Sequence, residues 1–320
     1  MKIGFVSENG FWGKVPEDFD NARTEYCWMF NLDALHAPLN SQIYGLDLDF
    51  DLIVLIIPKK VIPVNNKSFV EILKKHSKGV AVMQEGSFWN FQDMDLQTQI
   101  WYSNEYASAD YIFCHNESDA KYYRGIYDKT PVMVLRSAMI PHTIKDIIPT
   151  PEDKTIIGGN FCSWYGGFDS YMVAQEFKNG IYAPAMGRKK DGEEQLLNIL
   201  PYMNWVEWMK TLSQFKYAVH LMRTFGAGTF AMNCGYFSIP CIGYNGLDTQ
   251  EYIHPHTSVD LGDIESARQI ARKLKSDSDF YNECSVLAKQ RSKRYSDKML
   301  WLENFQTAFS RSSFQPIKPH

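Results

Sequence analysis

Short apolar runs alternate with amphipathic segments along the first half of the chain. Each apolar run has the length of a buried strand, and each intervening segment repeats apolar residues at the spacing of one helix face. Strands are predicted at residues 2–6, 52–57, 79–83, 111–114 and 132–135, and helices at 24–35, 68–76, 96–107 and 118–127. Strands that alternate with helices in this way form a parallel sheet covered on both faces.

A polar stretch rich in proline interrupts this alternation in the middle of the chain. Residues 142–154, with prolines around and within them, are predicted to form a linker. Strands are then predicted at 155–157, 217–221 and 240–243, and helices at 170–177, 228–237 and 264–309. We therefore expect an α/β protein with two Rossmann-like domains, 1–147 and 148–295, that face a central cleft. Residues 296–320 are expected to form a helix that returns to the first domain, followed by a tail.

Size and composition agree with two soluble domains. The 320 residues, of which 45% are hydrophobic and 22% charged, exceed one ordinary core. The net charge of −4 excludes a general attraction to nucleic acid or to an acidic membrane, so any polyanion site has to be local. No apolar run is long enough to span a membrane, and cysteines without a C-x-x-C pair predict reduced thiols and a cytoplasmic protein. The oligomeric state stays open.

A turn with two glycines follows the predicted strand 217–221. Arg223, Gly226, Gly228 and Thr229 lead into the next helix. The first N–H groups and the positive dipole end of such a helix favour an anion, for example a diphosphate, and Arg223 can add a charged contact. The same residues also fit an ordinary tight connection between a strand and a helix.

A second glycine turn favours the anion site over the ordinary connection. Gly158, Gly159 and Asn160 also come directly after a predicted strand. Both turns would therefore lie at the carboxyl edge of one sheet, which is the edge where α/β proteins bind ligands.

At this point the chain resembles the GT-B glycosyltransferases. Residues 233–240, Asn-Cys-Gly-Tyr-Phe-Ser-Ile-Pro, are similar to that superfamily's Glu-Ala-x-Ala-x-Gly-x-Pro element, and residues 205–209 resemble the segment before its nucleobase contacts. The resemblance implies a nucleotide-sugar donor, expected to be a UDP-sugar, in the second domain. Asn233, counted among the donor contacts, stands where many members place a glutamate on the ribose hydroxyls. Phe225 stands where retaining members place a second glutamate.

A narrower similarity is to the phage DNA β-glucosyltransferases. That family opens its second domain with a Gly-Gly-Ser-Phe-x-Ser turn, and residues 158–163, Gly-Gly-Asn-Phe-Cys-Ser, resemble it. The resemblance adds Ser163 to the expected donor contacts. It also implies a catalytic base just past a strand of the first domain, where this chain has Glu85.

Glu85 also stands out from the residue pattern itself. It follows an apolar strand and precedes Gly-Ser-Phe-Trp89, so it would project from the carboxyl edge of the sheet beside aromatic surface. A partly desolvated carboxylate there could accept a proton from an acceptor hydroxyl, although a loop carboxylate paired with an arginine fits equally well. Arg23 and Glu25, at the start of a predicted helix, are candidates with Trp89 for acceptor or sugar contact. A simple capping pattern is the alternative for Arg23 and Glu25.

No metal site and no cofactor are predicted. Asp47 and Asp49 mimic a D-x-D signature but lead directly into a strand, and His254 and His256 lack partners at ligand spacing. The sequence therefore predicts a metal-independent glycosyltransferase in which Glu85 deprotonates the acceptor.

The residues give less support for a particular acceptor than for the nucleotide-sugar donor. The similarity to the phage enzymes favours a hydroxymethylated pyrimidine in DNA, which would be flipped into the site, with Lys14, Lys59 and Lys60 near the backbone phosphates. A bacterial surface glycan or a small metabolite is an alternative acceptor. A third possibility is a protein that binds nucleotide sugars without turnover.

Overall fold

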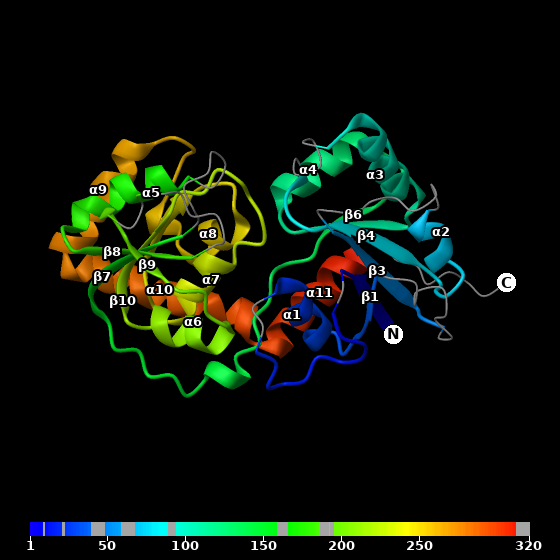
Figure 1. Ribbon diagram of the computed structural model, residues 1–320, viewed down its shortest axis with the longest axis horizontal. Coiled ribbons are helices and arrows are strands. Elements are labelled where there is room, and N and C mark those ends of the chain that lie inside the picture. Colours follow the sequence, from blue (N-terminus) through cyan, green and yellow to red (C-terminus); the bar gives the residue numbers. More distant parts are fainter. Residues whose placement is uncertain are drawn as a thin grey trace. The chain divides into compact units, whose positions relative to one another are not determined.

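The computed structural model describes residues 1–8, 10–20, 23–39, 49–58, 68–88, 94–158, 166–185, 192 and 195–311. The chain forms two compact units (Figure 1). The first comprises Met1–Glu17, Arg23–Ala138 and Lys298–His320, and the second comprises Asp18–Ala22 and Met139–Asp297. Within the described residues each unit is built on one six-stranded parallel sheet, which confirms the predicted α/β class.

The sheet of the first unit has the order β2-β1-β3-β4-β5-β6. Its strands are β1 (Ile3–Ser7), β2 (Leu35–Pro38), β3 (Leu52–Ile57), β4 (Val80–Gln84), β5 (Tyr111–Cys114) and β6 (Val132–Val134). Its helices are α1 (Thr24–Asn31), α2 (Phe69–Leu73), α3 (Leu96–Ser108), α4 (Glu117–Ile126) and α11 (Lys298–Arg311). Because β1 lies between β2 and β3, the direction in which strands are added reverses between β1 and β3.

Burial and helix packing fix this arrangement. All six residues of β3 are apolar and buried, as expected for a strand covered on both faces. Side chains of α2, α3 and α4 join one face of the sheet in a common core. The last helix lies beside α1 in the same unit (Figure 1), and the indoles of Trp28 and Trp301 both donate to the Arg136 carbonyl, at 2.7 and 3.2 Å. The C-terminal helix thus returns to the first unit.

The sheet of the second unit has the order β12-β11-β10-β7-β8-β9. Its strands are β7 (Glu152–Ile157), β8 (Gly180–Pro184), β9 (Asn198–Leu200), β10 (Phe215–His220), β11 (Cys241–Tyr244) and β12 (Ser258–Val259). Its helices are α5 (Gly167–Ala174), α6 (Trp205–Leu212), α7 (Thr229–Tyr236), α8 (Asp248–Ile253), α9 (Ile264–Ser276) and α10 (Ser278–Ser296). This is the strand order of dinucleotide-binding domains, with the reversal between β7 and β10.

The middle of the chain differs from the prediction. Residues 142–154 contain a 3-10 turn, His142–Ile144, and the start of β7, where a linker was expected. Met139 and Ile144 are buried in a core of the second unit, so the division between the units falls after Ala138. The predicted helix 264–309 is three helices, because Asp277 and Asp297 adopt extended backbone at the two breaks.

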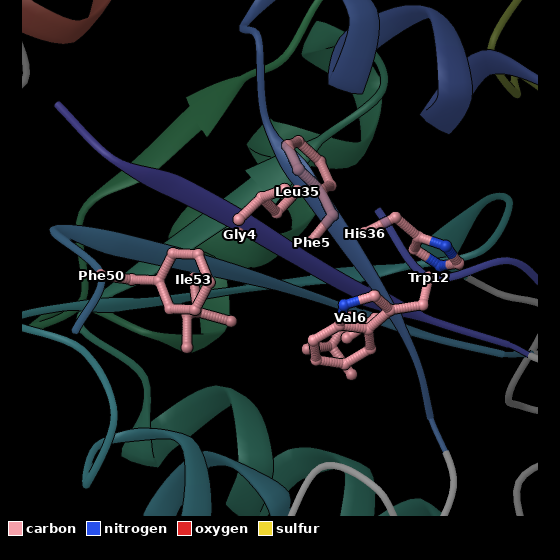
Figure 2. Close-up of a pocket in the computed structure, with 9 residues that line it drawn as sticks. Gly4, Phe5, Val6, Trp12, Leu35, His36, Phe50 and Ile53 are labelled. Atoms are coloured by element: carbon pink, nitrogen blue, oxygen red, sulfur yellow. The ribbon is translucent and has the colours of Figure 1, made fainter. Parts of the chain in front are cut away.

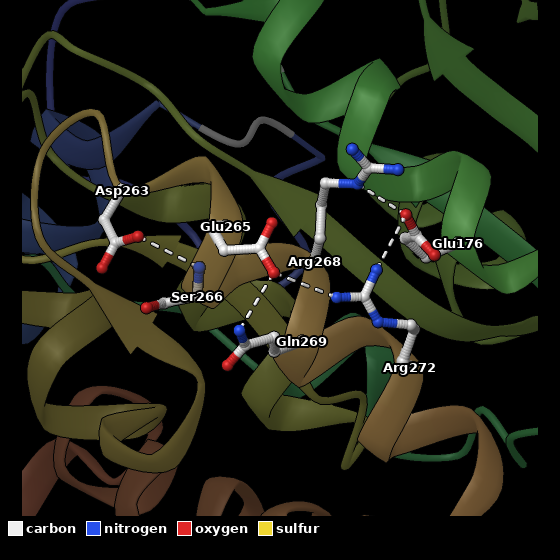
Figure 3. Close-up of polar contacts among 7 residues, drawn as sticks. All are labelled: Glu176, Asp263, Glu265, Ser266, Arg268, Gln269 and Arg272. Carbon is white, nitrogen blue, oxygen red and sulfur yellow. Dashed lines mark hydrogen bonds and ion pairs between the residues drawn. The ribbon is translucent and has the colours of Figure 1, made fainter.

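A network of ion pairs connects α9 to the 3-10 turn Gln175–Phe177, which follows α5. The Glu176 carboxylate accepts from Arg268 at 2.5 Å and pairs with Arg272 at 3.3 Å, while Arg272 also reaches Glu265 (Figure 3). Burial acts to raise the pKa of Glu176, but the two guanidinium groups outweigh it and lower that pKa. No helix in the described part of the chain has both the length and the apolar character needed to cross a membrane.

Candidate functional site

The strand reversals locate one candidate site in each unit. In open α/β sheets, ligands bind outside the carboxyl ends of the strands where the strand order reverses. This point lies between β1 and β3 in the first unit and between β7 and β10 in the second. Most of the predicted site residues that the structure describes lie at one of these edges.

Two helices of the second unit begin beside the reversal. α5 and α7 both start after a glycine with left-handed backbone, Gly166 at φ 65° and Gly228 at φ 67°. The chain reaches α5 from β7 and α7 from β10, and these two strands are neighbours. Neither glycine supplies a side-chain cap, and the first N–H groups of a helix have no partner within the helix. Two positive helix ends therefore lie at the same edge, which suits an anion.

The glycines at this edge serve different purposes. A side chain on Gly228 would place its first carbon 1.9 Å from the Thr249 hydroxyl oxygen, and one on Gly158 would place it 2.6 Å from the His220 ring. Packing therefore requires glycine at both positions. A side chain on Gly226 would meet no atom within 4 Å, so Gly226 is the predicted glycine that leaves open space for a ligand.

Arg223 is held in place by a carboxylate that the sequence analysis missed. Its Nη2 and Nε donate to Asp169 Oδ2 at 2.9 and 3.3 Å, and the Tyr244 hydroxyl donates to the same oxygen at 3.1 Å. The hydrogen bond and the charge of Asp169 raise the pKa of Arg223. Burial and Asp169 together raise the pKa of Tyr244. The Arg223 side chain is 55% exposed, so the guanidinium is both oriented and accessible.

Asn233 has an internal role in the structure. The residue is 4% exposed. With its amide oriented so that the nitrogen donates to the Thr229 carbonyl, the oxygen accepts from the Trp208 indole, both at 3.1 Å. These contacts link the first turns of α7 to α6, and we leave Asn233 out of the proposed donor contacts.

In the first unit, three carboxylates surround one guanidinium. Arg23, which precedes α1, forms ion pairs with Glu8 after β1 and with Glu25 in α1, and its Nη2 lies 4.0 Å from Glu85 Oε1. Glu85 follows β4 and its side chain is 31% exposed. The predicted candidates Arg23, Glu25 and Glu85 thus lie together, and Glu8 joins them.

Neighbouring charges in this cluster affect the pKa values of Glu25 and Arg23. Burial raises the pKa of Glu25, Arg23 opposes that effect, and Glu85 adds to it. Burial works to lower the pKa of Arg23, but the carboxylates of Glu25 and Glu8 outweigh it and raise that pKa. With three carboxylates and one cation, the edge is suited to accepting a proton from a hydroxyl.

A buried histidine anchors the loop that carries Glu8. His36 in β2 lies 2.9 Å through Nε2 from the Ser7 hydroxyl and 2.5 Å through Nδ1 from the Phe11 carbonyl. Burial lowers the pKa of His36, so the neutral ring donates to Phe11 and accepts from Ser7. The same residue lines a small apolar hollow beside Trp12 and Phe50, which Figure 2 shows. This hollow lacks the convergent polar groups of a catalytic site.

Several predicted site residues lie outside the described residues. They are Gly159, Asn160, Ser163, Trp89, Lys59 and Lys60. Lys14 is described and pairs with Asp33 at 2.7 Å on the surface.

The described histidines do not form a metal centre. His254 is 3% exposed, with Nε2 2.9 Å from the Ala231 carbonyl, and His256 pairs with Glu283 at 3.4 Å. Among the residues that the structure describes, no group of three or more His, Cys, Asp or Glu side chains is placed to hold a metal ion.

No protein-family model and no curated protein sequence matches the chain. Solved structures do match along its length. An alpha-glucosyltransferase in complex with UDP and a 13-mer DNA containing an HMU base has a TM-score of 0.65 at 12% identity, with 97% of this chain and 99% of that chain covered. Sucrose-phosphate synthase from Thermosynechococcus elongatus has a TM-score of 0.61 at 10% identity, covering 98% and 100%.

A third structure matches over part of its length. TarM has a TM-score of 0.59 at 12% identity, and the match covers 80% of this chain but 54% of TarM. At these identities the likeness concerns the fold. The two parallel six-stranded sheets and their helices match those of the GT-B glycosyltransferases. The chain therefore has the GT-B fold.

Proposed function

We propose that this protein transfers a sugar from a UDP-sugar to a hydroxyl acceptor. The observation that carries the proposal is the edge between β7 and β10, where two glycine-capped helices begin and Arg223 is oriented by Asp169. Such an edge suits a diphosphate. Structures of the same fold in complex with UDP or UDP-glucose support the nucleotide.

In this proposal the edge of the first sheet accepts the proton, and the edge of the second sheet stabilises the leaving group. The acceptor hydroxyl loses its proton to the Glu85 carboxylate, and its oxygen forms a bond to the anomeric carbon of the sugar. The bond between that carbon and the diphosphate oxygen breaks, and UDP leaves with the electron pair. Arg223 and the N–H groups near Gly226 and Thr229 stabilise the charge that develops on the leaving group.

For the acceptor we propose a hydroxymethylated pyrimidine in DNA. An alpha-glucosyltransferase crystallised with such DNA matches the chain over nearly the full length of both proteins. TarM and sucrose-phosphate synthase share the fold, so a glycan or a small metabolite is the competing acceptor. Lys14, although paired with Asp33, is exposed and can exchange this partner for a phosphate.

A screen for the donor tests the enzyme proposal. Thermal unfolding in the presence of different nucleotide sugars identifies the donor, because a ligand at 100 times its Kd adds about 2.7 kcal/mol of stability. The bound donor is then incubated with candidate acceptors, and release of the nucleoside diphosphate is measured. Binding without release or transfer would favour the non-catalytic alternative. An absence of binding to every nucleotide sugar would reject the proposal.

Salt dependence tests DNA as the acceptor. Binding that neutralises phosphates weakens with salt, with a log-log slope near −0.9 for each phosphate on duplex DNA. Binding and transfer are measured on duplexes with and without hydroxymethylated pyrimidines, between about 50 and 200 mM salt. No transfer to the modified duplex, or binding indifferent to salt, would leave a glycan or small-molecule acceptor.

A further inference from the structure

His220 is the last residue of β10 and lies at the strand reversal of the second sheet. Its ring fills the space beside Gly158, where a side chain would place its first carbon 2.6 Å from the His220 Cδ2 atom. The ring also packs against Phe230 in the first turn of α7, with ring centroids 4.8 Å apart. The imidazole therefore lies between the end of β7 and the start of α7, where the proposed diphosphate site is.

This imidazole differs from an ordinary core histidine. It is 8% exposed, and among the described residues neither ring nitrogen has a hydrogen-bond partner. His254 is also buried, yet its Nδ1 lies 3.4 Å from the Cys241 backbone nitrogen and its Nε2 lies 2.9 Å from the Ala231 carbonyl. The two ring nitrogens of His220 are not among the described side-chain atoms that are fully buried without a partner, so they stay accessible at this edge and can hydrogen-bond a ligand that binds there.

We propose that His220 contacts the diphosphate of the bound nucleotide sugar and takes up a proton as this anion binds. The inference rests on the proposed function and adds a residue and a pH dependence to it. A protonated imidazole presents two N–H donors, one of which can reach a phosphate oxygen while its charge offsets that of the leaving group.

The surroundings of the ring explain why proton uptake waits for the anion. Burial lowers the pKa of His220 to about 4, so the ring is neutral in the free protein. Its neighbours on the adjacent strands and on α7 are Gly158, Gly243 and Phe230, none of which titrates.

Other titratable groups among the described residues lie on the loop after β10 and on the elements beside it. They are Arg223 and its partner Asp169, with the Tyr244 phenol. An anion placed against the ring favours the imidazolium form and raises the pKa. Donor affinity should therefore increase as the pH falls, because the complex holds one more proton than the free protein.

Calorimetry with UDP-glucose as the probe tests this linkage. Both phosphates of UDP-glucose are esterified, so the probe itself does not titrate near pH 6 as a phosphate monoester does. If binding raises the pKa to an ordinary histidine value, affinity rises roughly tenfold between about pH 8 and pH 5.5. His220→Gln keeps a neutral N–H donor and should show no such rise. His256→Gln, which removes an exposed histidine of the same unit, should keep the wild-type slope.

Two results would overturn the inference while leaving the transferase proposal intact. One is a wild-type affinity for UDP-glucose that does not change with pH, and the other is a His220→Gln variant that retains the slope. A failure of the wild type to bind any nucleotide sugar would instead reject the proposed function, and the inference with it.

Nuclear magnetic resonance of the imidazole supplies a readout that does not depend on the sugar. The His220 signal is identified by its absence in His220→Gln and is titrated with and without inorganic pyrophosphate. A pKa that rises by more than about one unit with pyrophosphate supports proton uptake. An unchanged pKa in the presence of bound pyrophosphate contradicts it.

Discussion

At the carboxyl edge of the first sheet, the carboxylates of Glu8, Glu25 and Glu85 gather around one guanidinium. At the same edge of the second sheet there are two glycine-capped helix starts, and Asp169 holds Arg223. The first edge is therefore suited to receiving a proton and the second to receiving an anion. The equivalent edges of two similar sheets thus differ in chemistry because of a few residues at strand ends and helix starts.

The largest effect is expected from Glu85 in the first unit. Glu85→Gln keeps the size of the side chain but removes the base, so the transfer rate should fall about 10²- to 10⁴-fold. Donor affinity should stay unchanged because the proposed donor site lies in the second unit. Steady-state kinetics and calorimetry measure the two quantities. Glu71→Gln, on the exposed surface of α2, is the matched control, and full activity in Glu85→Gln would assign the base to another carboxylate.

A substitution at Arg223 in the second unit should instead lower the affinity for the donor. Arg223→Ala removes a charge that Asp169 and Tyr244 orient, and should weaken UDP binding by about 1.5–3 kcal/mol. Arg124→Ala, which breaks an exposed ion pair with Glu117 in the first unit, should leave UDP binding unchanged. Calorimetry that gives the same affinity for folded Arg223→Ala and wild type would remove Arg223 from the site.

Substitutions of two glycines in the second unit should distinguish a role in packing from a role in ligand contact. Gly228→Ala forces a side chain onto left-handed backbone and into the Thr249 hydroxyl, so unfolding should become about 1–3 kcal/mol easier. Gly226→Ala meets no neighbour and should change stability by less than about 0.5 kcal/mol, but should weaken donor binding. Urea unfolding and calorimetry measure the pair. Equal destabilisation by both substitutions would mean that Gly226 also serves packing.

Strands and helices could be predicted from the sequence more accurately than the contacts between site residues. The run 52–57 forms β3 as predicted, because an unbroken apolar run between polar residues has few alternatives. β2, β8, β9 and β12 were missed because they are short, and tertiary pairing stabilises them. The predicted helix 24–35 accordingly ends at Asn31, and β2 begins at Leu35.

The sequence could indicate which residues lie at the carboxyl edge of a sheet, but it could not show which of them contact one another. Arg23 and Glu25 were found together at one helix start and Glu85 was found separately after a strand, and their contact follows from the positions of β4 and α1. Glu8 carried the same signal as Glu85, a carboxylate directly after a strand, and could have been found. Asp169 and His220 could not, because their roles depend on Arg223 and Gly158, which are distant in sequence.

A smaller effect is expected from the ion pairs of Glu176. Its pKa in the folded protein lies below the ordinary value of 4.5, so its contribution is complete above about pH 4.5 and disappears as the pH falls through the folded pKa. Glu176→Gln should cost about 1 kcal/mol near neutral pH, and the difference from wild type should narrow in acid. Urea unfolding at a series of pH values measures this. Glu265→Gln, at a more exposed carboxylate, should cost less, and a constant difference down to about pH 3 would contradict the assignment.

Removing divalent metal ions is expected to leave the transfer rate unchanged, which is the smallest of the predicted effects. In enzymes that use a divalent ion on a diphosphate, the ion offsets the negative charge of the leaving group. Here Arg223 and the first N–H groups of α5 and α7 are placed to supply that positive charge. The transfer rate should therefore be the same with EDTA as with added magnesium, and Arg223→Ala should become the variant whose residual activity gains from magnesium. Activity of the wild type that vanishes in EDTA and returns with magnesium or manganese would show that the protein groups do not replace the ion.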